Sequence, residues 1–328
     1  MKQSILAPFW NAGQGRARAG WRILVQGGGY ALILFGMQWL VFSRLNDAAI
    51  SFAYPFSMIA ASLLALWLAG RWLDRRPFAD FGLHLNSAWW VDLGFGLLLG
   101  AVLMALIFAV EYAAGWVTIT ELWHRGSAAP FWLAMLVGLW HFVAVGINEE
   151  IISRGHMLRN LAEGLNMARI GPRWALLLAY LLSSGMFGLF HIFNPNSSWV
   201  STLLLVAAGL FLGLGYVLTG ELSIPIGLHI SWNFFQGRVF GFPVSGGKAG
   251  TTLFAIQQNG PTLWTGGDFG PEAGLIGLIA ILIGCGLTVL WVKGRYGKVQ
   301  LEGRLAVYQL SGEQQAAAEP LPAAPRMK

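Results

Sequence analysis

The chain has 328 residues, of which 56% are hydrophobic and only 11% charged, with a mean hydropathy of +0.59. Soluble domains carry about 25% charged residues, so this composition excludes a water-soluble globule of this size. The 16 Trp and 21 Phe residues exclude a disordered chain, and the single Cys excludes both a disulfide framework and a Cys-rich zinc site. We therefore predict an all-α, polytopic membrane protein.

Eight stretches resemble membrane spans, each of which needs about 20 mostly apolar residues. In chain order they are Trp21–Phe42, Ala49–Ala69, Trp89–Ala114, Phe131–Ile152, Trp174–Phe193, Trp199–Leu218, Leu222–Phe235 and Gly274–Val292. The seventh is too short to cross upright, and Pro225 near its start indicates a broken or re-entrant helix. Such a break is tolerated only where it is buried in protein or lines a wet cavity.

The spans divide the chain into three parts. Residues 1–20 are expected to form a cytoplasmic interfacial segment, residues 21–293 the transmembrane bundle, and residues 294–328 a cytoplasmic tail that is disordered from about residue 312. Within the bundle, Gly237–Pro271 is expected to be a long, Gly-rich external loop that could act as a lid.

The basic residues indicate orientation. If the N-terminus is cytoplasmic, the inside segments carry 17 of the 21 Lys and Arg residues, and the outside segments keep only Arg44, Arg125, Arg238 and Lys248. Because cytoplasmic loops are enriched in Lys and Arg, this bias predicts cytoplasmic termini and an even number of spans, in the plasma membrane if the protein is bacterial. The net charge of +6 is thereby explained by topology, and we expect no nucleic-acid partner.

Three groups of polar residues lie in the late spans. Asn148–Arg154 ends the fourth span, Phe187 to His191 lies late in the fifth, and His229 to Asn233 lies inside the seventh. Ionisable side chains inside a bilayer are expensive and by default mark function. Other ionisable residues in or near the spans have simpler explanations. Asp92 and Glu111 lie toward span ends, where they can reach the membrane–water interface, and His156 is expected to be solvated.

Helical spacing predicts how these side chains point. Glu150 and Arg154 are four residues apart, so they share a face and can pair. Glu149 is rotated from Glu150 by about 100°, so it can reach a cavity while its neighbour is held by Arg154. His229 and Asn233 are again four residues apart and present one face.

The three motifs can share one site only if their side chains lie at similar depths in the membrane, and the sequence predicts different depths. If Glu163–Arg173 is the hairpin between the fourth and fifth spans, Glu150 and His191 differ in height by roughly 8 Å, and the fourth helix must run beyond Ile152. His229 would lie lower than His191 unless the helices around Asn194–Asn196 are shortened.

Two glutamates, two histidines and an asparagine in an apolar bundle suit the activation of water for peptide hydrolysis. A carboxylate can take a proton from water, and a histidine can orient that water and protonate the leaving amine. A second histidine with an asparagine amide can stabilise an oxyanion. Alternatively, Glu149, His191 and His229 could bind one divalent metal such as zinc, which would polarise the water.

The order Glu149-Glu150-x-x-x-Arg154, Phe187-x-x-x-His191, His229-x-x-x-Asn233 resembles the CPBP (CAAX protease and bacteriocin-processing) family, over about Phe131–Gly237. That family includes the Ras-converting CAAX endopeptidase and the Abi-type bacterial proteins. The resemblance implies an eight-helix intramembrane endopeptidase, with its site between the fourth, fifth and seventh helices and its cavity open toward the cytoplasm. It implies membrane lipid and a peptide, membrane-protein or lipidated substrate as partners.

The resemblance also implies roles for individual residues. Glu149 would activate the water, and Glu150 and Arg154 would shape the first motif. His191 would assist in proton transfer or hold the water, while His229 and Asn233 would stabilise the tetrahedral intermediate. Both a metal-dependent and a metal-free glutamate mechanism stay open.

Three other interpretations compete with this one. The same Glu and His residues could relay protons in a coupled transporter, or the fold could serve as a non-catalytic membrane scaffold. The glutamate pair could also belong to an interfacial salt-bridge cluster with Arg154, Arg159 and Glu163.

Overall fold

The computed structural model describes residues 8–308, apart from the side chain of Ala48. Residues 1–7 and 309–328, which hold part of the predicted N-terminal segment and most of the predicted tail, lie outside that range. The helices are α1 Ala19–Met37, α2 Asp47–Leu68, α3 Ser87–Ala113, α4 Phe131–Glu150, α5 Arg159–Leu165, α6 Gly171–Phe190, α7 Trp199–Thr219, α8 Ser223–Phe234, α9 Thr262–Thr265 and α10 Leu275–Tyr296. The strands are β1 Trp10–Asn11, β2 Arg16–Ala17, β3 Val117–His124 and β4 Thr252–Gln258.

Seven helical segments in residues 8–308 are long and apolar enough to cross a membrane, and they coincide with seven of the eight predicted spans. The other, α8, has 12 residues, in agreement with the short seventh stretch of the sequence. The fourth span continues from α4 through π-helical Ile151–Leu158 into α5, forming one helical segment of 35 residues, Phe131–Leu165. The predicted extension beyond Ile152 is therefore present.

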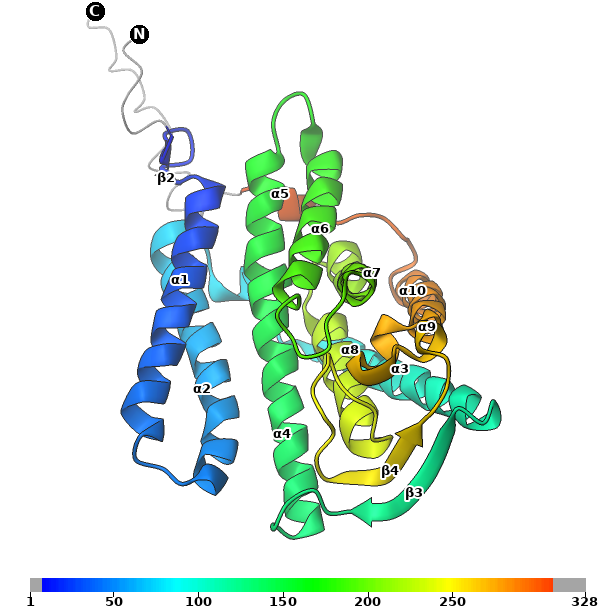
Figure 1. Ribbon diagram of the computed structural model, residues 1–328. Coiled ribbons are helices and arrows are strands. Elements are labelled where there is room, and N and C mark those ends of the chain that lie inside the picture. The colour runs from blue at the N-terminus through cyan, green and yellow to red at the C-terminus, as the bar shows by residue number, and fades with distance from the viewer. Residues whose placement is uncertain (1–7, 309–328) are drawn as a thin grey trace, which may run out of the picture.

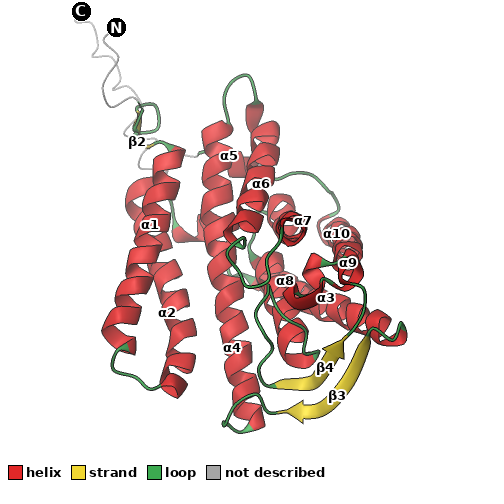
Figure 2. Cartoon of the chain, in the orientation of Figure 1, coloured by secondary structure: helices red, strands yellow, loops and turns green. Residues whose placement is uncertain are grey.

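Figure 1 shows α1 and α2 as a hairpin on one side of the long α4, with α6, α7, α8, α3 and α10 on the other side. Loops and the short strands connect these helices at the two ends (Figure 2). The two ends of the described chain meet, because the Arg16 guanidinium lies 3.4 Å from the centre of the Tyr308 ring. These ends of the described chain therefore lie together at one end of the bundle.

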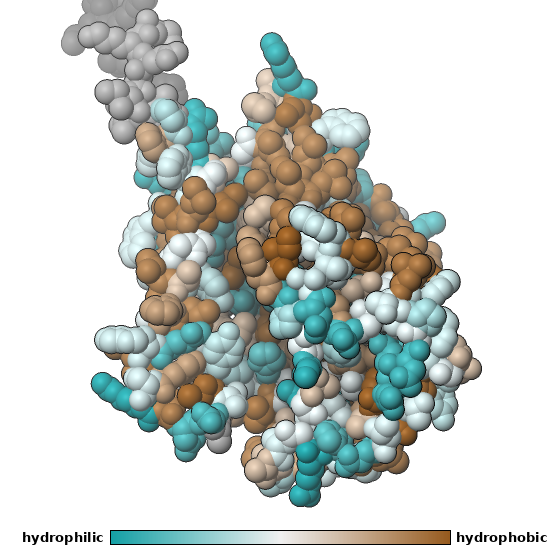
Figure 3. All heavy atoms as spheres, viewed as in Figure 1, coloured by the Kyte–Doolittle hydropathy of each residue, from teal (hydrophilic) through white to brown (hydrophobic). Residues whose placement is uncertain are grey.

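The outer surface is apolar along the helices. On α1 and the π-helical residues Gln38–Phe42 that continue it, Leu32, Phe35 and Trp39 are each 70–75% exposed. Figure 3 shows the same hydrophobic colouring over α6, α7 and α10. A large contiguous apolar surface on helices of this length is what a bilayer covers, and the chain is an integral membrane protein.

Close contact between α3 and α8 fixes the position of the third motif. A Cβ atom added to Gly227 would lie 2.3 Å from the carbonyl oxygen of Leu93, and one added to Gly96 would lie 2.5 Å from that of Ile224. Only glycine allows the two backbones to approach this closely. The short α8, which carries His229 and Asn233, is therefore held against α3 along its length.

The segment Gly237–Pro271 is ordered and contains a strand that sequence reasoning did not predict. β4 pairs with β3 in an antiparallel two-stranded sheet, with a register shift between Ile119 and Glu121. The same segment covers the turn after α6, because the Asn194 amide donates a 3.0 Å hydrogen bond to the carbonyl oxygen of Ser245. This loop therefore forms a wall of the bundle.

Two acidic residues of α3 do not reach the interface, which corrects the interpretation of Asp92 and Glu111. Both are fully buried. Asp92 accepts hydrogen bonds from the Trp291 indole, at 3.0 Å, and from Tyr296, and pairs with Arg295 at 3.0 Å. Glu111 accepts a 2.6 Å hydrogen bond from Gln258. The two carboxyl groups tie α3 to α10 and to β4.

His156 is not solvated, contrary to expectation. It is fully buried and contacts Asp74 at 3.0 Å, in a cluster of ion pairs at the end of the bundle that carries the chain ends. In that cluster Arg22 pairs with Asp74 at 2.8 Å and Arg16 pairs with Glu163 at 2.7 Å. Glu163 thus belongs to a group of charges separate from that of Glu149 and Glu150.

Candidate active site

The first and third motifs lie where α-helix changes to π-helix. α4 ends at Glu150 and π-helical Ile151–Leu158 follows, and α8 is followed by π-helical Phe235–Val239. A π-helical turn holds an extra residue, which shifts the side chains on either side of it, and such turns are frequent at functional sites.

Glu150 lies at the centre of a buried hydrogen-bonded group. One of its carboxylate oxygens accepts a 2.9 Å hydrogen bond from Arg154 and a 2.8 Å hydrogen bond from Nδ1 of His229. Arg154 also donates to the carbonyl oxygen of Gly209 on α7, at 2.8 Å. Glu150 and Arg154 are 0% and 1% exposed, and neither side chain lines the cavity.

Glu149 points in a different direction from its neighbour. Its side chain is 30% exposed, and its Oε2 lies 3.9 Å from Nε2 of His229. Since Nδ1 of His229 donates to Glu150, Nε2 is the nitrogen turned toward Glu149. The rotation expected from the sequence separates a buried glutamate from a cavity-facing one.

Phe187 connects the second motif to the other two. Its carbonyl oxygen accepts a 2.7 Å hydrogen bond from Nδ1 of His191, which must therefore carry a proton. Its ring covers the Arg154 guanidinium at 4.6 Å and contacts the rings of His191 and His229, with centroids 4.8 and 6.1 Å away. It separates the buried ion pair from the cavity and leaves Nε2 of His191 available.

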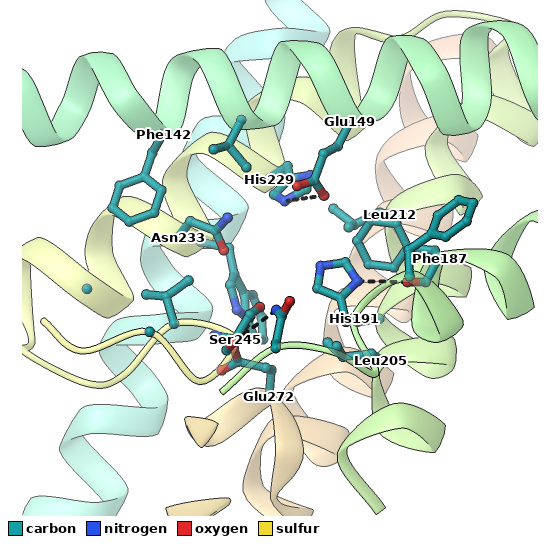
Figure 4. A pocket seen from close by; sticks show the side chains of 18 of the residues that line it. Phe142, Glu149, Phe187, His191, Leu205, Leu212, His229, Asn233, Ser245 and Glu272 are labelled. Atoms are coloured by element: carbon teal, nitrogen blue, oxygen red, sulfur yellow. Dashed lines mark hydrogen bonds and ion pairs between the residues drawn. The ribbon is translucent and has the colours of Figure 1, made fainter. Parts of the chain in front are cut away.

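These residues surround one cavity of about 780 Å³. Figure 4 shows the side chains of Glu149, His191, His229 and Asn233 around a common space. They come from α4, the end of α6, and α8, which are the fourth, fifth and seventh predicted spans. Of the six predicted site residues these four line the cavity, while Glu150 and Arg154 lie behind it.

His191 and His229 line the same cavity, although the sequence predicted a difference in depth between them. The helix α6 ends at Phe190, so His191 lies in the turn that follows it. That turn is held inside the bundle by the segment after α8, through the hydrogen bond between Asn194 and Ser245.

Several residues that line the cavity were not predicted to belong to the site. They are Tyr30 of α1, Ser245, Lys248 and Glu272 of the segment between α8 and α10, and Arg238 at the end of the π-helix after α8. Arg238 and Lys248 had been counted only as outside charges. Nothing in their local spacing indicates a site, because their position depends on how a long loop folds back.

A metal ion does not fit the side chains as they are arranged. Within residues 8–308, no three His, Cys, Asp or Glu side chains converge closely enough to hold an ion. Glu149, His191 and His229, which were predicted as the ligands if a metal is bound, share the cavity without forming such a group.

Residues 129–235 match a family model described as type II CAAX prenyl endopeptidase, Rce1-like. No curated protein and no solved structure matches the chain. The matched residues contain all three motifs and the helices that bring them together. Over this segment, the chain is similar to the family that its three motifs resemble.

Proposed function

We propose that the protein is an intramembrane endopeptidase, which hydrolyses a peptide bond of a membrane-associated or lipidated substrate with water activated by glutamate and histidine. The observation that carries this proposal is that Glu149, His191, His229 and Asn233 line one cavity inside an apolar bundle. The matched family is a protease family, which supports the same reaction class.

Glu149 is assigned the role of general base. It is the carboxylate that faces the cavity, and its Oε2 lies 3.9 Å from Nε2 of His229. A water between Glu149 and a substrate carbonyl would give up its proton to the carboxylate as it attacks. Glu150 cannot take this role because it is buried and already accepts two hydrogen bonds through one oxygen.

His229 and Asn233 are assigned to the oxyanion of the tetrahedral intermediate. The Glu150 carboxylate accepts from Nδ1 of His229 at 2.8 Å, so it orients the ring and turns Nε2 toward the cavity. A protonated ring can donate from Nε2 toward the cavity. Asn233 lies one turn further along α8 and supplies an amide donor to the same space.

His191 is assigned to proton transfer toward the leaving amine. Its Nδ1 is fixed by the carbonyl oxygen of Phe187, so Nε2 is the atom that can accept a proton in the cavity and pass it on. Since the side chains do not fit a metal ion, we propose a metal-free reaction and derive no step through one.

To test this proposal, the purified protein is incubated in detergent with a library of membrane-associated and lipidated peptides, and the products are identified by mass spectrometry. Glu149→Ala and His191→Ala should abolish product formation. Glu121→Ala and His84→Ala are matched controls, because both side chains are exposed, at 55% and 45%, and do not line the cavity. Cleavage that persists in both cavity variants would refute these roles, and proton flux without cleavage would favour a transporter.

A further inference from the structure

A second cavity, of about 420 Å³, lies at the end of the bundle where the two ends of the described chain meet. Its walls are the loop between β1 and β2, the first turn of α1, and α5 with the turn that follows it. Figure 1 places β2 and the start of α1 at that end. No residue lines both this cavity and the active-site cavity, so the two are separate.

Positive charge is in excess beside this second cavity. Glu163 lines it, and its two carboxylate oxygens lie within 4.0 Å of four guanidinium groups, which belong to Arg16, Arg22, Arg76 and Arg159. Asp74 pairs with Arg22 at 2.8 Å, and no other Asp or Glu oxygen in residues 8–308 lies within 4.0 Å of these groups. Four guanidinium groups thus share two carboxylates. Burial lowers the pKa of Arg16 to about 10, although Glu163 is beside it.

The same arginines have unused hydrogen-bond donors. Arg22 lines the cavity, its side chain is 2% exposed, and its Nε forms no hydrogen bond within residues 8–308. The buried Nε atoms of Arg76 and Arg159 also form none in that part of the chain. A buried donor of a charged group that lacks an acceptor costs free energy, which an anion bound beside it would recover.

The first turn of α1 adds backbone donors to the cavity. Ala19 and Gly20 line it, and their N–H groups form no hydrogen bond in the described part of the chain. The N-cap residue, Arg18, provides no side-chain cap, and the turn holds no acidic residue. The start of a helix carries a partial positive charge and binds anions such as phosphate. Gln14, whose Oε1 accepts from Arg16, keeps its amide N–H groups as further donors.

This cavity lies beside the surface that a bilayer covers. Trp21, Leu24 and Val25, in the first two turns of α1, are exposed, and the Phe9 ring contacts that of Trp21 with centroids 5.0 Å apart. Tryptophan is enriched at the level of the lipid headgroups. The first turn of α1 therefore lies at the depth of the lipid phosphates, and the rest of α1 lies along the acyl chains.

We propose that the second cavity binds the phosphate of an anionic phospholipid, held by Arg18, Arg22 and the first turn of α1. Basic pockets between membrane-spanning helices bind headgroups of this kind. The excess of positive charge disfavours the choline group of a zwitterionic lipid. Because Gly27 and Tyr30 of α1 line the active-site cavity, the bound lipid holds one wall of that cavity in place. Lipid binding here does not depend on the proposed peptidase reaction.

The test compares phosphatidylglycerol and phosphatidylcholine with the same acyl chains, by native mass spectrometry and by thermal unfolding in detergent. Wild type should bind phosphatidylglycerol at least about tenfold more tightly, as expected for charge-assisted hydrogen bonds, and should gain Tm only with that lipid. Gly20→Asp should bring the affinity ratio close to one, because its carboxylate takes the place of the phosphate. A Cβ atom at Gly20 meets nothing within 4 Å and an acidic residue suits the first turn of a helix, so Tm without lipid should not fall.

The control is Gly294→Asp, which makes the same charge change at an exposed glycine that lines neither cavity and should keep the wild-type ratio. Arg18→Gln should weaken the binding of phosphatidylglycerol about three- to tenfold, whereas Arg71→Gln, an exposed arginine outside the cavity, should not. Equal binding of the two lipids to wild type, or an unchanged ratio in Gly20→Asp, would overturn the proposal. If inorganic phosphate raises Tm as much as phosphatidylglycerol and removes the preference between the lipids, the cavity holds free phosphate and the proposal is wrong.

Discussion

The adjacent glutamates should respond in opposite ways to the same conservative substitution. Glu149→Gln should abolish turnover and leave stability almost unchanged, because the side chain is 30% exposed and makes one ionic contact, at 3.9 Å. Loss of a general base costs about 10²–10⁴-fold in rate. A change at a partly exposed side chain without further partners stays within about 0.5 kcal/mol.

Glu150→Gln should instead destabilise the bundle. It removes the negative charge beside Arg154, which is only 1% exposed, and weakens the hydrogen bond from His229. Removing the charge of one partner of a buried ion pair lowers the free energy of unfolding by about 3–5 kcal/mol. The lower value applies here because the amide oxygen of Gln can still accept both hydrogen bonds. At about 2–4 °C per kcal/mol this predicts a fall of about 6–12 °C in apparent Tm.

Both variants can be compared in detergent by thermal unfolding and by peptide cleavage on the same preparation. The predicted pattern is an inactive, stable Glu149→Gln and a destabilised Glu150→Gln with part of its activity at low temperature. Equal Tm values for the two variants, or turnover of Glu149→Gln within tenfold of wild type, would refute the division into a buried and a cavity-facing carboxylate.

Four further outcomes follow from the structure. Asn233→Ala should lower kcat by about 10²–10³-fold with little change in Tm, since it removes one donor to the oxyanion; an unchanged kcat would exclude that role. Gly227→Ala should lower stability by about 1–3 kcal/mol, because its Cβ would meet the carbonyl oxygen of Leu93 at 2.3 Å, whereas Gly94→Ala, with nothing within 4 Å, should not. The pKa of Glu272 is raised from its ordinary value of 4.5 to about 7, so the folded state favours the neutral carboxyl group. The stability that this neutral group contributes is fully present below pH 4.5 and is lost as the pH rises toward 7. Glu272→Gln should therefore gain stability relative to wild type between pH 5 and pH 8, by up to about 3 kcal/mol, and a constant difference in Tm would contradict this. Cleavage should survive prolonged treatment with a chelator, and loss of activity restored by zinc would show that a metal participates.

The long helices and the division of the glutamate pair could be predicted because both depend on local patterns. Apolar stretches of about 20 residues identify spans without knowledge of their neighbours. A helix turns by about 100° per residue, which is enough to separate Glu149 from Glu150 and to pair Glu150 with Arg154. The contact of Glu150 with His229 needed the tertiary structure, since 79 residues separate them.

The errors concern residues whose partners lie far along the chain. Asp92 and Glu111 were expected near water because they lie toward span ends, and His156 because it lies in a basic stretch, yet each is buried against a residue at least 82 positions away. The pairing of β3 with β4 could not be predicted for the same reason, since more than 100 residues separate the strands. Arg238 was missed as part of the cavity because its position depends on Gly138 and Gly250.

The central claim is that one cavity-facing carboxylate activates water for peptide hydrolysis within the membrane. It is tested most directly by reconstituting wild type and Glu149→Gln in vesicles that contain a cleavable peptide and a pH-sensitive dye. Product should form only with wild type, as measured by mass spectrometry, and the internal pH should not follow an imposed gradient in either sample. Proton movement that depends on Glu149 while the peptide stays intact would contradict the claim.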